Sequence, residues 1–326
     1  MKNLISIAVL MSILTTAFPQ TFKGTVLDES TNKPISFATI YFNGTTVGTY
    51  SNDNGNFELG ITPYRLVPIT ISAIGYYSVT LSDYVTDKPQ IIYLTPKVYK
   101  ISEVTVAESG KDFIKKRKRY LKIFRNEFLG QTVNASKCEI VNENDILFHD
   151  NGNDSLIAFA SKPILINNKA LGYSIKYYLN KFEYCSSRRT LTIWGNYIFE
   201  DNLKSLKNPK IYKNRKNAYL GSRMHFFRIL WENKLDSVGY LVLNSNSDKV
   251  NYNSLVDHSD STAKYFTYKG SLCVKYYRRM WHKSDVVVKN QIYFDKSGYF
   301  DPFGITWSGE MANQRIGDLL PYEYSL

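Results

Sequence analysis

Alternating apolar and polar residues dominate the first third of the chain and predict short β-strands. The stretches TISAI (70–74) and SVTLS (78–82) place apolar side chains on one face of a strand and polar side chains on the other. Asn43-Gly44 is typical of a type I′ hairpin turn. We expect strands at residues 22–27, 36–42, 45–50, 56–59, 67–73, 77–81, 90–94 and 100–106. Short strands at this spacing predict a small β-sandwich.

The stretch SNDNGNFEL (51–59) resembles both a calcium loop and a turn. In a calcium loop that begins at Asp53, Phe57 would occupy a position that needs an oxygen ligand, and Tyr64 would replace the terminal Glu. The stretch therefore favours a turn in which Gly55 supplies a positive φ. Phe57 and Leu59 would then point into the sandwich.

The hydrophobic period changes to that of a helix at residues 108–128, where we expect a basic amphipathic linker helix. One face carries Phe113, Ile114, Tyr120, Leu121, Phe124 and Phe128. The other face carries a basic patch of Lys115, Lys116, Arg117, Lys118 and Arg119. The helix either packs on the second domain or lies on an anionic envelope surface.

Residues 129–326 predict a β-rich α+β domain with an antiparallel sheet. We expect strands at 138–141, 146–148, 156–160, 174–184, 190–199, 239–243, 264–268, 271–278, 285–294 and 298–303, with a hairpin turn at 294–299. Helical spacing of apolar residues predicts a single helix over 218–235. The chain as a whole is expected to be mainly β.

The first 19 residues predict a signal peptide, because Lys2 precedes an apolar run over 4–14 that is too short to span a membrane. We therefore expect an exported protein in the periplasm, at the outer-membrane surface or secreted. The mature chain has no further apolar run of transmembrane length. Export permits disulfides among Cys138, Cys185 and Cys273, although three buried thiols are an equal alternative.

The net charge of +12 is concentrated in two segments. Residues 111–125 hold eight basic residues and one acidic residue, and residues 203–217 hold six basic residues and no acidic one. In an exported protein such patches favour an envelope protein, an acidic glycan or anionic lipid as partner over nucleic acid. Two solvated basic faces are the structural alternative.

Several motifs resemble the carboxypeptidase regulatory-like domain. They are GTVLD (24–28), KPISFATI (33–40), VGTY (47–50), SNDNGNFEL and ISAIGY (71–76). The resemblance implies a seven-stranded transthyretin-like sandwich over residues 20–107, a module that is not an enzyme by itself. It is common in exported proteins of Bacteroidetes-type bacteria. Residues 129–326 resemble the C-terminal half of an uncharacterised group of such proteins, which implies no activity.

The histidines are not spaced as zinc ligands. His149, His225, His258 and His282 lack the short His–Glu spacing of zinc peptidases, and the chain contains no GxSxG elbow or glycine-rich phosphate loop. We therefore predict no catalytic, metal or cofactor site. A Cys138–His149 pair that meets in space remains an alternative.

The segment GSRMHFFR (221–228) is the most suggestive polar cluster. Ser222, Arg223, His225 and Arg228 would surround a helix N-terminus, where free N–H groups favour a phosphate or carboxylate. The alternative is a packed helix with an exposed arginine face and a hydrogen-bonded histidine.

Aromatic residues in the strands are candidates for stacking on sugar rings. In the pairs Tyr177-Tyr178 and Tyr276-Tyr277, at most one ring should face a ligand, because neighbours on a strand point to opposite faces. Tyr197 is a further candidate, and a core role is the favoured interpretation for all of them. Taken together, the sequence favours a non-catalytic exported binding module for a protein, glycan or envelope component. The alternative is a hydrolase whose site assembles in the C-terminal half.

Overall fold

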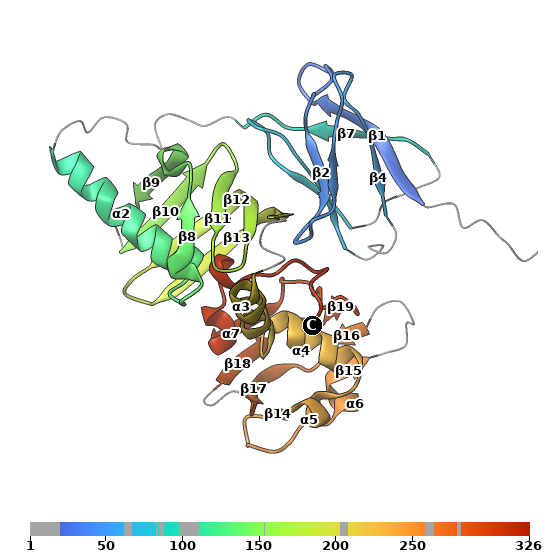
Figure 1. The fold of residues 1–326 in the computed structure, drawn as a ribbon, viewed down its shortest axis with the longest axis vertical. Helices are drawn as coiled ribbons and strands as arrows, with labels where there is room; N and C mark the ends of the chain where they lie inside the picture. The colour runs from blue at the N-terminus through green and yellow to red at the C-terminus, as the bar shows by residue number, and fades with distance from the viewer. Residues whose placement is uncertain are drawn as a thin grey trace, which may run out of the picture.

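The computed structural model describes residues 20–61, 67–82, 84, 88–97, 111–152, 154–202, 208–257, 264–278 and 282–326. The predicted signal peptide, the predicted strand at 100–106 and His258 lie outside these residues. Figure 1 shows three bodies, a blue N-terminal sandwich, a green sheet with helix α2, and a gold-to-red C-terminal body. Within the described residues, no helix is both long and apolar enough to cross a membrane.

The N-terminal body is the predicted seven-stranded sandwich. One sheet has the order β4-β1-β7, and the other has the order β3-β2-β5-β6. The strands are β1 (Thr21–Asp28), β2 (Thr39–Phe42), β3 (Gly48–Tyr50), β4 (Asn56–Gly60), β5 (Ile69–Ser72), β6 (Val79–Leu81) and β7 (Gln90–Leu94). Alternation along β1 buries Phe22 and Val26 between the sheets. The SNDNGNFEL stretch is a turn as predicted, since Gly55 has φ +75° and Phe57 is buried.

The middle body is a six-stranded antiparallel sheet covered by one helix. The strands are β8 (Cys138–Ile140), β9 (Ile146–Asp150), β10 (Ser155–Ala160), β11 (Ile164–Asn168), β12 (Tyr173–Cys185) and β13 (Thr190–Asp201). β13 pairs with almost the whole of β12, so β11 and β10 share the other edge of β12. Helix α2 (Lys111–Leu129) packs Phe124 and Phe128 onto this sheet, with ring centroids 4.7 Å from Phe182 and 4.9 Å from Tyr177 respectively.

The C-terminal body combines short helices with two small antiparallel sheets. The helices are α3 (Pro209–Tyr219), α4 (Arg223–Trp231), α5 (Leu235–Val238), α6 (Tyr252–Leu255) and α7 (Glu310–Asn313). One sheet joins β14 (Tyr240–Leu243), β17 (Gly270–Tyr276), β18 (His282–Val288) and β20 (Ile305–Gly309), and the other joins β15 (Val256–Asp257), β16 (Lys264–Phe266) and β19 (Ile292–Phe294). The predicted hairpin turn is present, with Gly298 at φ +82°.

The single helix predicted over 218–235 was wrong. Gly221 has φ +82° and Ser222 caps a new helix, so the chain turns between α3 and α4. Asn233, with φ +54°, separates α4 from α5. The predicted strand at 298–303 is also absent, because this segment forms the loop between β19 and β20.

The Asn43-Gly44 turn is not a two-residue type I′ turn. The turn is closed by the Thr45 N–H, which donates to Phe42 O at 3.2 Å, but of its two central residues only Gly44 has a positive φ, at +77°, whereas a type I′ turn requires a positive φ at both. Residues 43–47 join the two strands, and their backbone also bonds to the other two bodies. The Gly44 N–H donates to Tyr197 O at 2.8 Å, and the Tyr322 N–H donates to Gly44 O at 3.0 Å. The Thr46 N–H donates to Glu323 Oε1 at 2.7 Å. This loop therefore joins the sandwich to β13 and to the C-terminal tail.

Candidate functional site

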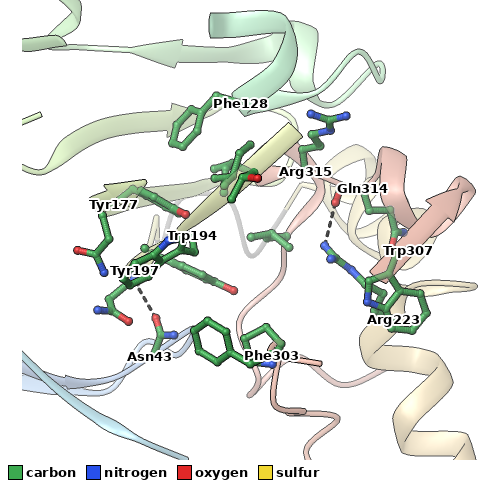
Figure 2. Close-up of a pocket in the computed structure, with 18 of the residues that line it drawn as sticks. Asn43, Phe128, Tyr177, Trp194, Tyr197, Arg223, Phe303, Trp307, Gln314 and Arg315 are labelled. Atoms are coloured by element: carbon green, nitrogen blue, oxygen red, sulfur yellow. Dashed lines mark hydrogen bonds between the residues drawn. The ribbon is translucent and has the colours of Figure 1, made fainter. Parts of the chain in front are cut away.

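A large cavity lies where the three bodies meet. Its volume is about 1570 Å³, and its walls come from the sandwich, the β12–β13 hairpin, the start of α4 and the segments 293–309 and 314–322. Figure 2 shows side chains from these separate elements turned toward one another. A cavity walled by three bodies requires that the contacts between them be well defined, and the 43–47 loop supplies such contacts.

Each body contributes one solvent-exposed aromatic residue to this cavity. Tyr77 of the sandwich is 52% exposed, Trp194 of β13 is 47% exposed, and Phe303 of the β19–β20 loop is 66% exposed. The Trp194 and Phe303 rings form an edge-on pair with centroids 6.3 Å apart. Exposed rings leave flat apolar faces available for a ligand.

A β-bulge places polar groups beside Trp194. The β12–β13 register shifts between Leu179 and Lys181, so Asn180 has no partner in the strand pairing and lines the cavity. On the facing strand, the backbone at residue 195 lies so close to β12 that only glycine fits. A Cβ on Gly195 would lie 2.4 Å from Tyr178 O. Asn196 also lines the cavity, so two amides flank the aromatic wall.

The structure divides the predicted anion cluster into two parts. Ser222 and Arg223 line the cavity, whereas His225 and Arg228 point away from it into the C-terminal body. Ser222 Oγ accepts the N–H of His225 at 3.0 Å and caps its own helix. The four residues therefore do not form one anion site, and the cluster's anion role stays a prediction for Arg223.

Arg228 has a structural role in holding the C-terminal tail. Its Nε donates to Ser297 O at 2.7 Å, Nη1 to Tyr324 O at 2.7 Å and Nη2 to Tyr322 O at 2.9 Å. All three nitrogens of the guanidinium are thus bound by backbone carbonyls. The sequence alternative of a packed helix expected its arginines to be exposed, but Arg228 is only partly exposed.

His225 is a buried, neutral histidine. The Gly221 N–H donates to its Nδ1 at 3.1 Å, and the Tyr240 hydroxyl lies 2.8 Å from the same atom. An acceptor at Nδ1 places the ring proton on Nε2. Burial, and then the charges of Arg228 and Arg278, lowers the pKa of His225 to about 4. No acid or thiol is hydrogen-bonded to His225 among the described residues.

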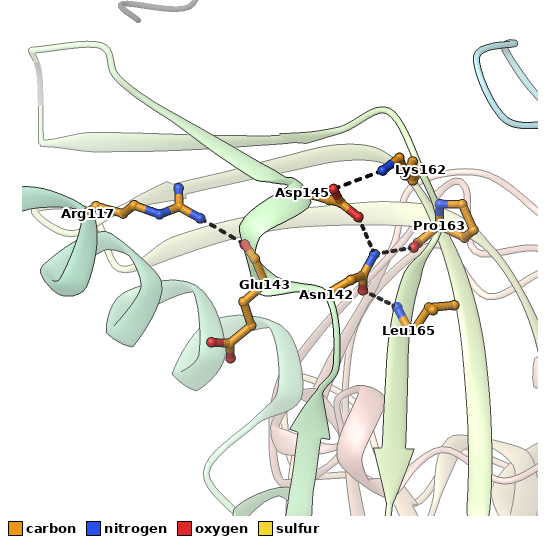
Figure 3. Close-up of polar contacts among 7 residues, drawn as sticks. All are labelled: Arg117, Asn142, Glu143, Asp145, Lys162, Pro163 and Leu165. Carbon is orange, nitrogen blue, oxygen red and sulfur yellow. Dashed lines mark hydrogen bonds and ion pairs between the residues drawn. The ribbon is translucent and has the colours of Figure 1, made fainter. Parts of the chain in front are cut away.

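The predicted basic patch on α2 is partly a structural contact. Arg117 donates to Glu143 O at 2.9 Å and to Ile146 O at 3.0 Å, and Asn142 ties the same turn to β11 through Pro163 and Leu165 (Figure 3). Arg119 lies 3.9 Å from Asp150. The three lysines of the predicted patch, Lys115, Lys116 and Lys118, are all exposed.

A clearer lysine stripe follows one face of the helix. Lys111, Lys115, Lys118 and Lys122 are spaced at i, i+4, i+7 and i+11, and all four are exposed. None of the four has an acidic partner within the described ranges. The stripe extends about 16 Å along the helix.

The tyrosines are mainly core residues, which is the interpretation that the sequence favoured. Tyr177 and Tyr197 do line the cavity, but their rings stack on each other with centroids 5.6 Å apart. Tyr177 and Tyr178 are both buried, because Tyr178 stacks on Tyr41 of the sandwich with centroids 5.8 Å apart. Tyr276 is buried and Tyr277 is exposed, as strand alternation predicts. Trp194 could have been identified as a site residue from the sequence. It alternates in step with Thr190 and Thr192, so it lies on the exposed face of β13, where a large aromatic residue is unusual.

The Cys138–His149 pair and a metal site are the catalytic arrangements that the sequence raised. Cys138 Sγ lies 3.6 Å from Asn134 O, and no hydrogen bond joins it to His149 among the described residues. There, no three His, Cys, Asp or Glu residues gather as a metal site would require. Cys138, Cys185 and Cys273 are all described, and no disulfide joins them. Burial, and then Asp318, raises the pKa of Cys138 to about 12, which disfavours the thiolate.

Residues 22–106 match the model of the CarboxypepD_reg-like domain. No curated protein is significantly similar to the chain. Among solved structures, a candidate carbohydrate binding protein from Bacteroides uniformis is similar at 13% identity, covering 56% of this chain and 80% of that one, with a TM-score of 0.19. A 9R-lipoxygenase from Cyanothece is similar at 10% identity, covering 70% of this chain and 52% of that one, with a TM-score of 0.18. The family model confirms the resemblance drawn from the sequence motifs.

Proposed function

We propose that this chain, with its CarboxypepD_reg-like domain, is an exported, non-catalytic binding protein that holds a glycan in the cavity between its three bodies. The observation that carries the proposal is the convergence of Tyr77, Trp194 and Phe303 on one cavity. Sugar rings have an apolar face and a hydroxyl rim, which suit aromatic rings flanked by the amides of Asn180 and Asn196.

The size of the cavity favours a chain of sugars over a single sugar. Its volume of about 1570 Å³ exceeds the roughly 300–1,000 Å³ of sites for drug-sized ligands. The stacking rings belong to different bodies, so a ligand that contacts all three must extend across the junction. An oligosaccharide meets both requirements.

Binding of an oligosaccharide library to the wild-type protein and to Trp194→Ala tests this function. Trp194 is about half exposed, so its loss should leave the fold intact and reduce affinity by at least tenfold. Tyr277→Ala is the matched control, because Tyr277 is 64% exposed and lies outside the cavity. Equal loss in both variants, or binding of extended peptides in place of sugars, contradicts the proposal. Chromatography of the recovered sugar tests the hydrolase alternative, because a hydrolase would return shortened oligosaccharides and a binding protein would return them intact.

The lysine stripe of α2 supports a second function, adhesion to an anionic lipid surface. Ile114 is 66% exposed beside the stripe, and each lysine near such a surface contributes about 1 kcal/mol. Replacing Lys111, Lys115, Lys118 and Lys122 by Gln should abolish co-sedimentation with phosphatidylglycerol vesicles. A control removes four ion-paired lysines, Lys162, Lys169, Lys234 and Lys249, and should keep binding. Equal loss in both variants overturns this function.

Export itself is tested by the mature N-terminus. Expression of the full chain in a Gram-negative host, followed by N-terminal sequencing of the envelope fraction, should give a start within a few residues of Gln20. An intact Met1 in the cytoplasmic fraction contradicts export.

A further inference from the structure

Two partly buried cationic side chains line the cavity without an acidic partner among the described residues, and the exposed Arg189 is a third cation of the wall. Arg223 donates one hydrogen bond, from Nη2 to Gln314 O at 2.9 Å (Figure 2), and the Lys97 Nζ lies 5.7 Å from the centroid of the Tyr77 ring. Within the described ranges neither forms an ion pair. Desolvation lowers the pKa of both groups, so each positive charge is partly removed from water without compensation.

Other partly buried arginines of the chain are compensated. Arg215 pairs with Asp201 at 2.9 Å, and Arg315 pairs with Glu127 at 3.1 Å. Arg228 donates to three carbonyls. Removing a charge from water costs free energy unless the charge is paired. Unlike these three arginines, Arg223 at the cavity wall has neither an acidic partner nor a full set of hydrogen-bond acceptors in the described part of the chain.

The two acidic residues of the cavity wall, Asp301 and Asp318, accept hydrogen bonds from neutral groups and not from Arg223 or Lys97. Asp318 accepts from Thr132 Oγ1 at 2.7 Å and from Asn134 Nδ2 at 2.8 Å. Asp301 accepts from the Phe303 N–H at 2.9 Å. Arg223 and Lys97 are therefore cations of the cavity wall that form no ion pair among the described residues, which suits an anionic ligand group.

We propose that the cavity binds a sugar chain that carries anionic groups, with Arg223 gripping one of them through paired N–H···O bonds and Lys97 as a second cationic contact. The planar guanidinium fits the two oxygens of a carboxylate or sulfate. The proposal rests on the glycan-binding function and deepens it by assigning the charge of the ligand.

Calorimetry with an oligogalacturonate and its carboxyl-reduced, neutral form tests the assignment. The wild type should prefer the acidic form, and Arg223→Met should weaken that binding by about 10- to 100-fold while leaving the reduced form unaffected. Lys97→Met should lose less, and Trp194→Ala should weaken both forms. Equal affinity of the wild type for the two forms, or unchanged acidic binding by Arg223→Met, overturns the inference. A sulfated chondroitin hexasaccharide that binds more tightly than oligogalacturonate assigns the group as sulfate, and the reverse order assigns it as carboxylate.

Titration with glucuronate or inorganic sulfate at constant ionic strength separates this inference from the glycan proposal. Tryptophan fluorescence should change saturably in the wild type and not in Arg223→Met, whereas Lys115→Met, which removes an exposed charge far from the cavity wall, should respond normally. If the wild type shows this fluorescence change but binds no oligosaccharide, the glycan proposal is overturned and the anion site stands. Absence of the change in the wild type overturns the anion site. Arg223→Lys keeps the positive charge and loses the planar guanidinium, so it should lose less anion affinity than Arg223→Met. It replaces Arg223→Met in this experiment if Arg223→Met does not fold.

Discussion

The junction of the three bodies has a closed side and an open side, and their contacts differ sharply. On the closed side, loop 43–47 bonds through its backbone to Tyr197 and Tyr322, and Thr46 bonds to Glu323. On the open side, Trp194 and Phe303 stay exposed and Arg223 has a single hydrogen bond. The closed side fixes the geometry, and the open side keeps binding groups available.

Helix α4 contributes an arginine to each side. Arg223 and Arg228 are five residues apart, which turns them about 140° from each other around the helix axis. Arg228 holds the tail that contacts loop 43–47, while Arg223 faces the cavity. The same residue type on one helix thus acts as a structural clamp or as an available cation, depending on which side of the junction it reaches.

Arg228→Met should give the largest loss of stability. It removes a cation that donates to three backbone carbonyls and leaves those carbonyls without their donor, which should lower the free energy of unfolding by about 3–5 kcal/mol. Urea denaturation followed by circular dichroism measures the change. Arg223→Met is the paired variant and should cost less than about 1 kcal/mol. Equal losses would erase the distinction between the two sides.

Protonation of His225 should give the next largest effect. Its folded pKa of about 4 lies below the unfolded value of about 6.5, so the unfolded chain binds the proton more tightly. Its contribution is complete above about pH 6.5 and is lost as the pH falls toward 4, by about 3 kcal/mol in total. The stability difference between wild type and His225→Asn should therefore shrink over this range. A difference independent of pH would show that His225 titrates normally.

The sandwich was predictable because its signals are local. Alternation along β1 and the turn at Gly55 each depend on a few adjacent residues. The break between α3 and α4 was also encoded locally, by Gly221 followed by the cap Ser222, but the helical spacing of the apolar residues hid it. Helix periodicity alone does not locate a turn that keeps the apolar face in register.

The cavity was not predictable because it is assembled over long sequence distances. Tyr77, Trp194 and Phe303 come from three bodies, and no sequence spacing relates them. The same joint buries Tyr178, which strand alternation alone would place on the outer face, against Tyr41. Arg223 was identified as a candidate from its helix-terminal position, whereas its missing acidic partner is visible only in three dimensions.

Gly44→Ala should have the smallest of these effects and tests the closed side most directly. Gly44 has φ +77°, and a Cβ there would lie 2.7 Å from Tyr322 Cε2. Gly75→Ala is a matched control, because Gly75 has φ +85° and nothing within 4 Å of the added Cβ. Both variants incur the backbone strain of about 1–2 kcal/mol, and only Gly44→Ala also displaces the tail. We expect Gly44→Ala alone to increase proteolysis of the C-terminal tail and to weaken ligand binding. Identical behaviour of the two variants would mean that loop 43–47 does not hold the bodies together, and the cavity would then lack a fixed shape.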